Sequence, residues 1–177
     1  MSEVKWSIDP AHSNVGFKVK HMMFTNVKGR FDEYKASATT ADEDTLDQAN
    51  LTFEAQIGSI NTGNTDRDNH LKSNDFFDAE KYPTLSFKST DVVNTNAKNY
   101  QIKGDLTIKG ITNTVTLNAE YSGKLVDPWG NVKCGLIIEG SINRKDFGLN
   151  WNSALESGGV LVGEEVRLDI EVQLVKS

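Results

Sequence analysis

The chain has 177 residues, of which 37% are hydrophobic and 25% charged, a balance typical of a single folded domain with a sizeable core. Its formal net charge of −6 and its scattered lysines and arginines argue against nucleic acid or an anionic membrane surface as a partner. No stretch approaches the roughly 20 consecutive apolar residues that cross a bilayer, so no membrane span is expected.

The N-terminal residues and the cysteine content indicate the compartment. Residues Met1 to Trp6 contain no basic segment followed by an apolar run, so we expect a cytoplasmic protein, and a periplasmic or secreted one only if a signal has been removed. The single cysteine, Cys134, has no partner for an internal disulfide and lacks the Cys and His companions of a zinc site. We expect a buried structural thiol.

An alternation of apolar and polar side chains with a period of two recurs along the chain, as is typical of strands with one buried face. The alternating segments are 15–19, 51–57, 85–87, 100–108, 115–121, 132–142 and 166–174. Segment 27–40 brings the total to about eight strands, which predicts an all-β sandwich or barrel. A closed eight-stranded antiparallel barrel can be filled by its own side chains or can hold one ligand.

Turn signals separate these segments. Asp127-Pro-Trp-Gly130 predicts a type I turn, and Lys109-Gly110 predicts a break between two strands. Residues 94–99 form a polar connector, and residues 41–45 form a solvated acidic loop that lacks the glycine and final glutamate of a calcium site. Gly158-Gly159 is interpreted as a flexible bend.

One segment departs from the alternation. Residues 65–72 predict a short helix with Thr65 as its N-cap and Asp68 in a capping-box position, followed by an aromatic connector over 75–83. The helix carries Asp66, Asp68 and His70, the most enzyme-like cluster in the chain.

That cluster favours helix stabilisation over chemistry. On a helix, Asp66 and His70 share a face, whereas Asp68 points roughly the opposite way, so the three do not converge on a metal ion. We expect Asp66 to pair with His70 and Asp68 to pair with Lys72. Elsewhere, residues 9–13 predict a turn rather than a serine triad, and no phosphate loop or dinucleotide motif is present, so no cofactor, metal or catalytic residue is expected. His21 is interpreted as a core or rim residue.

Several large apolar residues lie outside the regular alternation. They can plug the ends of a barrel, yet together they suit an apolar pocket. They are Met22, Met23, Phe24, Phe31, Phe76, Phe77, Phe147 and Trp151.

A set of spaced motifs runs through essentially the whole chain. They are Trp6-Ser-Ile-Asp-Pro-Ala-His-Ser13, Val15-Gly-Phe17, His21-Met22, Val27-Lys-Gly-Arg-Phe31, Ile60-Asn-Thr-Gly-Asn64, Arg67-Asp68, His70-Leu71-Lys-Ser73, Asp75-Phe-Phe-Asp78, Tyr82-Pro-Thr84, Ser86-Phe87, Gly104-Asp-Leu-Thr-Ile-Lys-Gly110, Asp127-Pro-Trp-Gly130 and Ile142-Asn-Arg-Lys-Asp-Phe-Gly148 ahead of Trp151. In these motifs the sequence resembles the YceI-like family.

The resemblance implies one lipocalin-like barrel of eight antiparallel strands over residues 1–177, able to form a homodimer and enclosing a polyisoprenoid chain. No cofactor and no catalysed reaction go with the family in general. Many relatives begin with a signal peptide, and this chain shows none, so its compartment and its lipid can differ from theirs.

We therefore expect non-enzymatic binding of a polyisoprenoid or a similar amphiphilic lipid, for transport, storage or sensing. The candidate ligand-binding residues are Phe17, Val19, Met22, Phe24, Phe31, Phe53, Ile57, Leu71, Phe76, Phe77, Leu85, Phe87, Leu106, Ile108, Leu117, Leu136, Phe147 and Trp151, with Arg67 and Arg144 for a phosphate head group. For the two arginines we favour a simpler role, bracing the neighbouring Asp68 and Asp146.

Two alternatives stay open. One is a metal-dependent or hydrolytic enzyme that uses Asp66, Asp68 and His70. The other is a stress or interaction protein in which the barrel is only a scaffold, since a fold does not fix a function.

Overall fold

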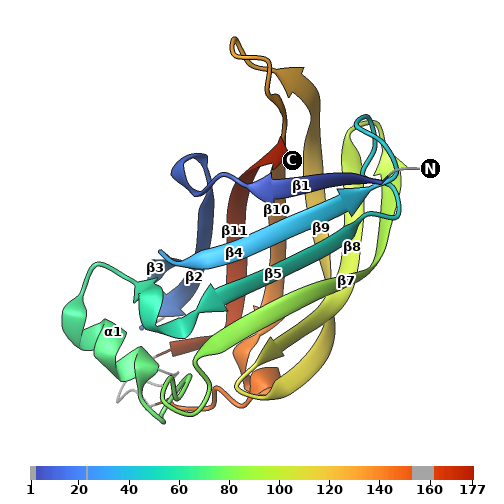
Figure 1. Ribbon diagram of the computed structural model, residues 1–177. Coiled ribbons are helices and arrows are strands. Elements are labelled where there is room, and N and C mark those ends of the chain that lie inside the picture. The colour runs from blue at the N-terminus through green and yellow to red at the C-terminus, as the bar shows by residue number, and fades with distance from the viewer. Residues whose placement is uncertain (1–2, 23, 153–161) are drawn as a thin grey trace.

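The computed structural model describes residues 3–22, 24–152 and 162–177, and its strands form one antiparallel sheet (Figure 1). The strands are β1 (Val4–Ile8), β2 (Asn14–His21), β3 (Thr25–Phe31), β4 (Tyr34–Thr40), β5 (Asn50–Gln56), β6 (Ile60–Asn61), β7 (Thr84–Asn96), β8 (Asn99–Ile108), β9 (Ile111–Val126), β10 (Val132–Asn143) and β11 (Val162–Lys176). The helices are α1 (Thr65–Lys72) and three 3-10 turns, η1 (Pro10–His12), η2 (Ile57–Ser59) and η3 (Arg144–Phe147).

Eight of the strands close into a ring. Their order is β1-β4-β5-β7-β8-β9-β10-β11, and the ring closes where Trp6 of β1 pairs with Lys176 of β11. The predicted eight-stranded antiparallel barrel is thus confirmed. The predicted strand over 27–40 is instead two strands, β3 and β4, because β3 pairs with β2 and β6 whereas β4 pairs with β1 and β5.

β11 has two neighbours along one edge. It pairs with β1 near its C-terminal end and with β2 over most of its length. The turn η1 separates β1 from β2, and the Asp9 carboxylate caps it by accepting a hydrogen bond of 3.1 Å from the backbone N–H of Ala11. The turn predicted at residues 9–13 is therefore η1 with its flanking residues. Beyond β2, strands β3 and β6 extend the wall of the barrel towards α1 (Figure 1).

The strand connections are mostly tight. Lys109 and Gly110 both have positive φ, 54° and 75°, and join β8 to β9 at the predicted break. Asp127 accepts hydrogen bonds of 2.9 Å from the backbone N–H groups of Trp129 and Asn131 in the β9–β10 turn. The predicted connector over 94–99 is shorter than expected, because β7 continues to residue 96 and β8 starts at 99.

Helix α1 forms at the predicted residues but its capping differs. The N-cap is Asn64, whose side chain accepts a hydrogen bond of 2.9 Å from the backbone N–H of Arg67, and the predicted Thr65 cap is wrong. Asp68 accepts from the backbone N–H and the hydroxyl of Thr62, at 2.9 and 2.6 Å, instead of pairing with Lys72. This bond ties α1 to the end of β6.

His70 also has a different partner from the one expected. Its Nε2 lies 2.9 Å from an oxygen of Asp75, in the segment after α1, and not beside Asp66, which is exposed. The predicted bend at Gly158-Gly159 lies outside the described residues. Within the described part of the chain, no helix is long and apolar enough to cross a membrane.

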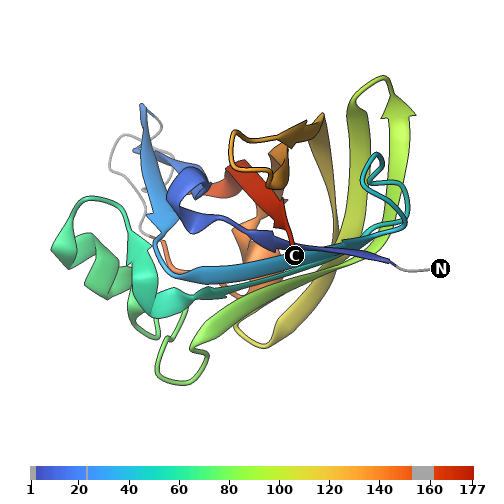
Figure 2. The same cartoon turned by 45° about the horizontal axis from the view of Figure 1, so that its top comes forward.

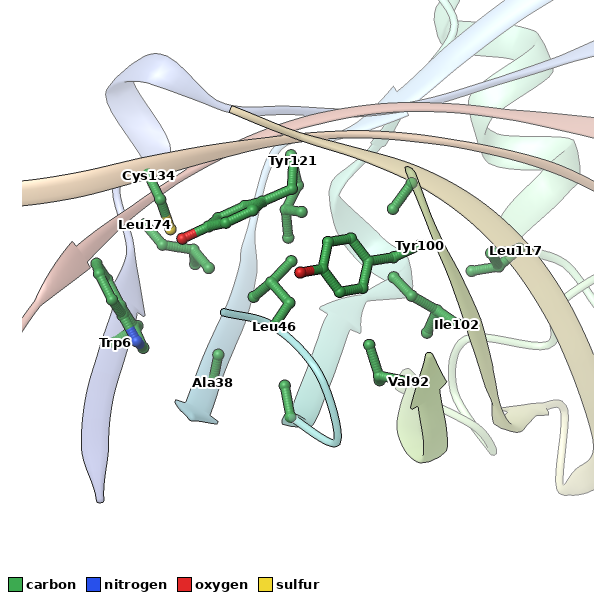
Figure 3. Packing of buried hydrophobic residues seen from close by; sticks show 13 residues of the cluster. Trp6, Ala38, Leu46, Val92, Tyr100, Ile102, Leu117, Tyr121, Cys134 and Leu174 are labelled. Carbon is green, nitrogen blue, oxygen red and sulfur yellow. The ribbon is translucent and has the colours of Figure 1, made fainter. Parts of the chain in front are cut away.

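A cluster of buried apolar residues packs together at the barrel end away from α1 (Figure 3). Leu46, from the loop between β4 and β5, is 1% exposed and reaches in towards Tyr100, whose ring makes an edge contact with that of Tyr121 at 5.9 Å. The indole N–H of Trp6 donates to the hydroxyl of Thr40 at 2.9 Å. Cys134 is buried there, as predicted, and burial raises its pKa to about 12.

Candidate functional site

Inside the barrel lies a cavity of about 360 Å³, within the range of roughly 300–1,000 Å³ that is usual for small-molecule sites. One of its walls is β11, whose alternation turns every second side chain inward. The residues that β11 contributes are Val162, Val166, Leu168, Ile170, Val172 and Leu174. Seen obliquely, the strands curve around this interior with α1 at one side (Figure 2).

Aromatic side chains line the wall, and glycines make room for them. An added Cβ at Gly29 would lie 2.5 Å from the ring of Phe17, its cross-strand partner, and one at Gly104 would lie equally close to the ring of Phe87. Both rings can therefore lie against the sheet only because the neighbouring residue has no side chain. The ring of Phe31 packs 5.7 Å from that of Phe17, which continues this surface towards α1.

The α1 end of the cavity is covered by helix residues and the connector that follows. The ring of Phe77 lies 6.4 Å from Phe31, so the connector rests on the barrel wall. The His70 ring makes edge contacts with Phe76 at 5.1 Å and with Trp151 at 4.7 Å. These contacts join α1, its connector and the segment after η3 into one aromatic cluster over the cavity.

Arg144 is buried at this end and is satisfied by backbone carbonyls. It is 3% exposed and donates to the carbonyls of Leu149 (2.5 Å), Gly163 (2.8 Å), Trp151 (2.9 Å) and Val162 (3.2 Å). The expected brace to Asp146 is therefore wrong. Burial lowers the pKa of Arg144, but an arginine remains charged at neutral pH. Its hydrogen bonds tie residues 149–151 to the start of β11.

Arg67 projects from the first turns of α1 and lines the cavity. Its Nη1 lies 3.4 Å from the hydroxyl of Thr62. The expected brace to Asp68 is absent from the described contacts, because the Asp68 carboxylate is engaged by Thr62 instead.

Most of the predicted ligand-binding residues line the cavity. Those that do are Phe17, Val19, Phe31, Phe53, Leu71, Phe76, Phe77, Leu85, Phe87, Leu106, Ile108, Leu117, Leu136, Trp151, Arg67 and Arg144.

Four of the predicted residues lie elsewhere. Ile57 and Phe147 are each 1% exposed and pack in the core cluster beside α1 without lining the cavity. Met22 and Phe24 lie in the β2–β3 turn with exposures of 40% and 82%. Met22 has a φ of 51°, so the chain reverses there and the inward alternation of β2 stops at His21.

Sequence reasoning also omitted many lining residues. Among the further apolar ones are Val15, Val27, Leu51, Val115, Ile138, Ile142, Val166, Leu168, Ile170 and Val172. Each lies in a strand, and all but Val27 lie in a segment whose alternation is visible in the sequence, so the same signal identifies their face. His21 and His70 line the cavity as well.

The enzyme-like cluster does not assemble. Asp68 is bonded to Thr62, His70 to Asp75, and Asp66 is exposed. Across residues 3–22, 24–152 and 162–177, no group of three or more His, Cys, Asp or Glu side chains is placed to hold a metal ion.

Comparisons with known proteins agree on one family. The model of the YceI-like domain matches residues 6–174. UPF0312 protein SA2479 of Staphylococcus aureus is 39% identical over 171 residues, covering 95% of each chain.

Solved structures share the fold. The YCEI protein of Campylobacter jejuni superposes with a TM-score of 0.75 at 34% identity, covering 96% of each chain. Burkholderia cenocepacia BcnA has a TM-score of 0.80 at 22% identity, covering 94% of this chain and 98% of that one. A polyisoprenoid binding domain from Saccharophagus degradans has a TM-score of 0.67 at 15% identity, covering 97% and 98%.

Proposed function

This chain belongs to the YceI-like family, and we propose that it binds a polyisoprenoid or a similar long amphiphilic lipid inside its barrel, without catalysing a reaction on it. The observation that carries the proposal is the cavity itself, which is enclosed by the strand ring and lined almost wholly by aliphatic and aromatic side chains. The polyisoprenoid binding domain from Saccharophagus degradans, which has the same fold, supports the choice of ligand.

The physical chemistry of the cavity favours a long flexible tail. Each buried CH₂ group contributes about 0.8 kcal/mol, so several isoprene units offset the cost of ordering the chain. Few polar groups face the middle of the cavity, and binding there depends on shape and apolar contact rather than on hydrogen bonds. A lipid of this kind can be carried, stored or sensed by the same barrel.

The test is to identify what the purified protein holds. The protein is isolated without detergent and examined by native mass spectrometry, then extracted with organic solvent and the extract analysed by mass spectrometry. We expect one hydrophobic molecule per chain with a repeating isoprenoid or long alkyl mass pattern. A protein that carries no lipid and binds no added polyprenol would contradict the proposal.

Two further expectations remain predictions. The cytoplasmic location is tested by cell fractionation, and the homodimer by light scattering at several concentrations.

A further inference from the structure

The charged side chains around the cavity are all of one sign. The chain carries 25 acidic residues against 19 lysines and arginines. Yet among the described residues the ionisable ones that line the cavity are all basic, namely Lys20, His21, Arg67, His70 and Arg144. In a protein with a net charge of −6, it is the reverse of what the composition alone predicts that the described ionisable residues lining the cavity are all bases.

These residues gather at the α1 end of the barrel. Arg144 donates to the carbonyl of Val162, which pairs with His21 across β11 and β2. Arg144 also donates to the carbonyl of Trp151, and the Trp151 ring lies 4.7 Å from that of His70. His21 and His70 are therefore each linked to Arg144, through Val162 and Trp151, at the α1 end of the cavity.

Most of these bases already have hydrogen-bond partners, or their side chains point away from the cavity. His70 is held by Asp75, and the N–H groups of Arg144 are directed at carbonyls. Lys20 borders the cavity but alternates with Val19 and His21, which directs its side chain to the outer face.

Arg67 differs from the other bases. It lies one helical turn before His70 on the inner face of α1 and is half-buried. Its hydrogen bond to Thr62 is long, at 3.4 Å, and no described carboxylate lies within 4.0 Å of its guanidinium group. A half-buried guanidinium with no counter-ion among the described residues, at the edge of an apolar cavity, is suited to an anion because charge-assisted bonds are strong where water is partly excluded.

We propose that the lipid bound by this protein is anionic, with a phosphate or carboxylate head held by Arg67 and its tail in the barrel. This inference rests on the proposed lipid binding and adds the chemistry of the head group. Arg144 adds a favourable potential at the same end, since its N–H groups are bonded to carbonyls and Glu164, the carboxylate that acts on it, is itself paired with Lys145 at 2.8 Å.

Binding of matched lipids tests the proposal. The probes are geranylgeraniol, geranylgeranyl monophosphate and geranylgeranoic acid, which share one tail and differ in the head. Dissociation constants are measured by displacement of a fluorescent lipid from the wild-type chain and from Arg67→Gln, Arg67→Lys and Arg30→Gln. Arg30 is a suitable control because it lies on β3, pairs with Asp32 and does not line the cavity.

In the wild type we expect at least one of the two anionic lipids to bind about tenfold more tightly than the alcohol, the ratio expected for one charge-assisted pair. Which anion gains identifies phosphate or carboxylate as the head. The ratio should fall to near one in Arg67→Gln, recover in part in Arg67→Lys, and stay at the wild-type value in Arg30→Gln.

Two results would overturn the inference while leaving the proposed function intact. One is equal binding of all three lipids by the wild type, and the other is a preference for anions that persists in Arg67→Gln. Failure of all three lipids to bind would instead contradict lipid binding itself.

Discussion

At the end of the barrel away from α1, the loop between β4 and β5 inserts Leu46 among tyrosine rings and leaves it 1% exposed. At the α1 end, the covering residues come from a short helix and a connector, and Leu71 stays half-buried. The two ends differ in what closes them, since a deeply buried loop residue closes one end and a partly exposed helix with its connector covers the other, beside the buried cluster of Ile57 and Phe147. The cavity between them is lined by residues of both core clusters.

The polar groups divide in the same way. At the packed end, the indole of Trp6 and the hydroxyl of Tyr121 find partners within the protein, on Thr40 and on the carbonyl of Glu43. At the α1 end, Arg67 keeps hydrogen-bonding capacity directed towards the cavity. Polar groups that are hydrogen-bonded within the protein favour rigidity, whereas donors with remaining hydrogen-bonding capacity favour the binding of a ligand.

The strongest test compares truncation at the two ends. Leu46→Ala should lower the free energy of unfolding by about 2–5 kcal/mol, because it opens a cavity in a close-packed core. Leu71→Ala should cost roughly 1 kcal/mol or less in the lipid-free protein, since its side chain is only partly buried. Urea titrations of both variants measure the difference, and similar losses at the two sites would show that the ends are not distinct.

A bulky residue in the middle of the cavity should affect binding. Ile170→Trp fills space on β11 and should weaken lipid binding at least tenfold, about 1.4 kcal/mol. Arg167→Trp adds the same ring to the outer face of β11 and serves as its control. Lipid retained after purification is quantified for each, and undiminished lipid in Ile170→Trp would place the ligand outside the barrel.

Alkaline pH should weaken the packed end. Burial raises the pKa of Cys134 to about 12 from its ordinary value of 9.0, so the folded state keeps the thiol protonated while the unfolded chain ionises. The free energy of unfolding is therefore unaffected by the thiol below pH 9. Between pH 9 and 12 it falls, by about 1 kcal/mol at pH 10. Comparing urea midpoints at pH 8 and pH 10 for the wild type and Cys134→Ala isolates this contribution. An identical pH dependence in both proteins would count against it.

The smallest effect is expected at the cover. Asp75→Asn removes the ion pair with His70, which is partly exposed and so worth about 0.2–1 kcal/mol. Amide hydrogen exchange should quicken in α1 and its connector and stay constant around Leu46. Protection of α1 that is unchanged from the wild type would mean that the aromatic contacts alone hold α1 and its connector in place.

The sequence predicted the barrel because strand alternation is a local property that the structure preserves. The inward faces of β8, β9 and β11 follow directly from it, and Leu106, Leu117 and their neighbours line the cavity as expected. Alternation cannot show where a strand reverses, and Met22 and Phe24 were therefore placed in the site although the chain turns at residue 22.

The partners of the charged side chains were not predictable in this way. The carbonyl shell of Arg144 comes from residues up to 19 positions away, and the Asp68 carboxylate turns back to Thr62 before the helix begins. Pairing rules for neighbouring residues assume that a side chain finds its partner along its own element. At Asp68, His70 and Arg144 the partner lies outside the side chain's own element.

The pairing of β1 with β11 also bears on how the protein behaves in concentrated solution. Because the ring closes, most of the sheet has no free edge on which a second chain could add a strand. A free edge remains at β6 and at the part of β3 that β6 does not cover, because β3 pairs with β6 only at Arg30 and Phe31; this part of β3 carries Lys28. Such a short, charged edge opposes aggregation, so an apolar interior is enclosed without exposing the chain to edge-to-edge polymerisation.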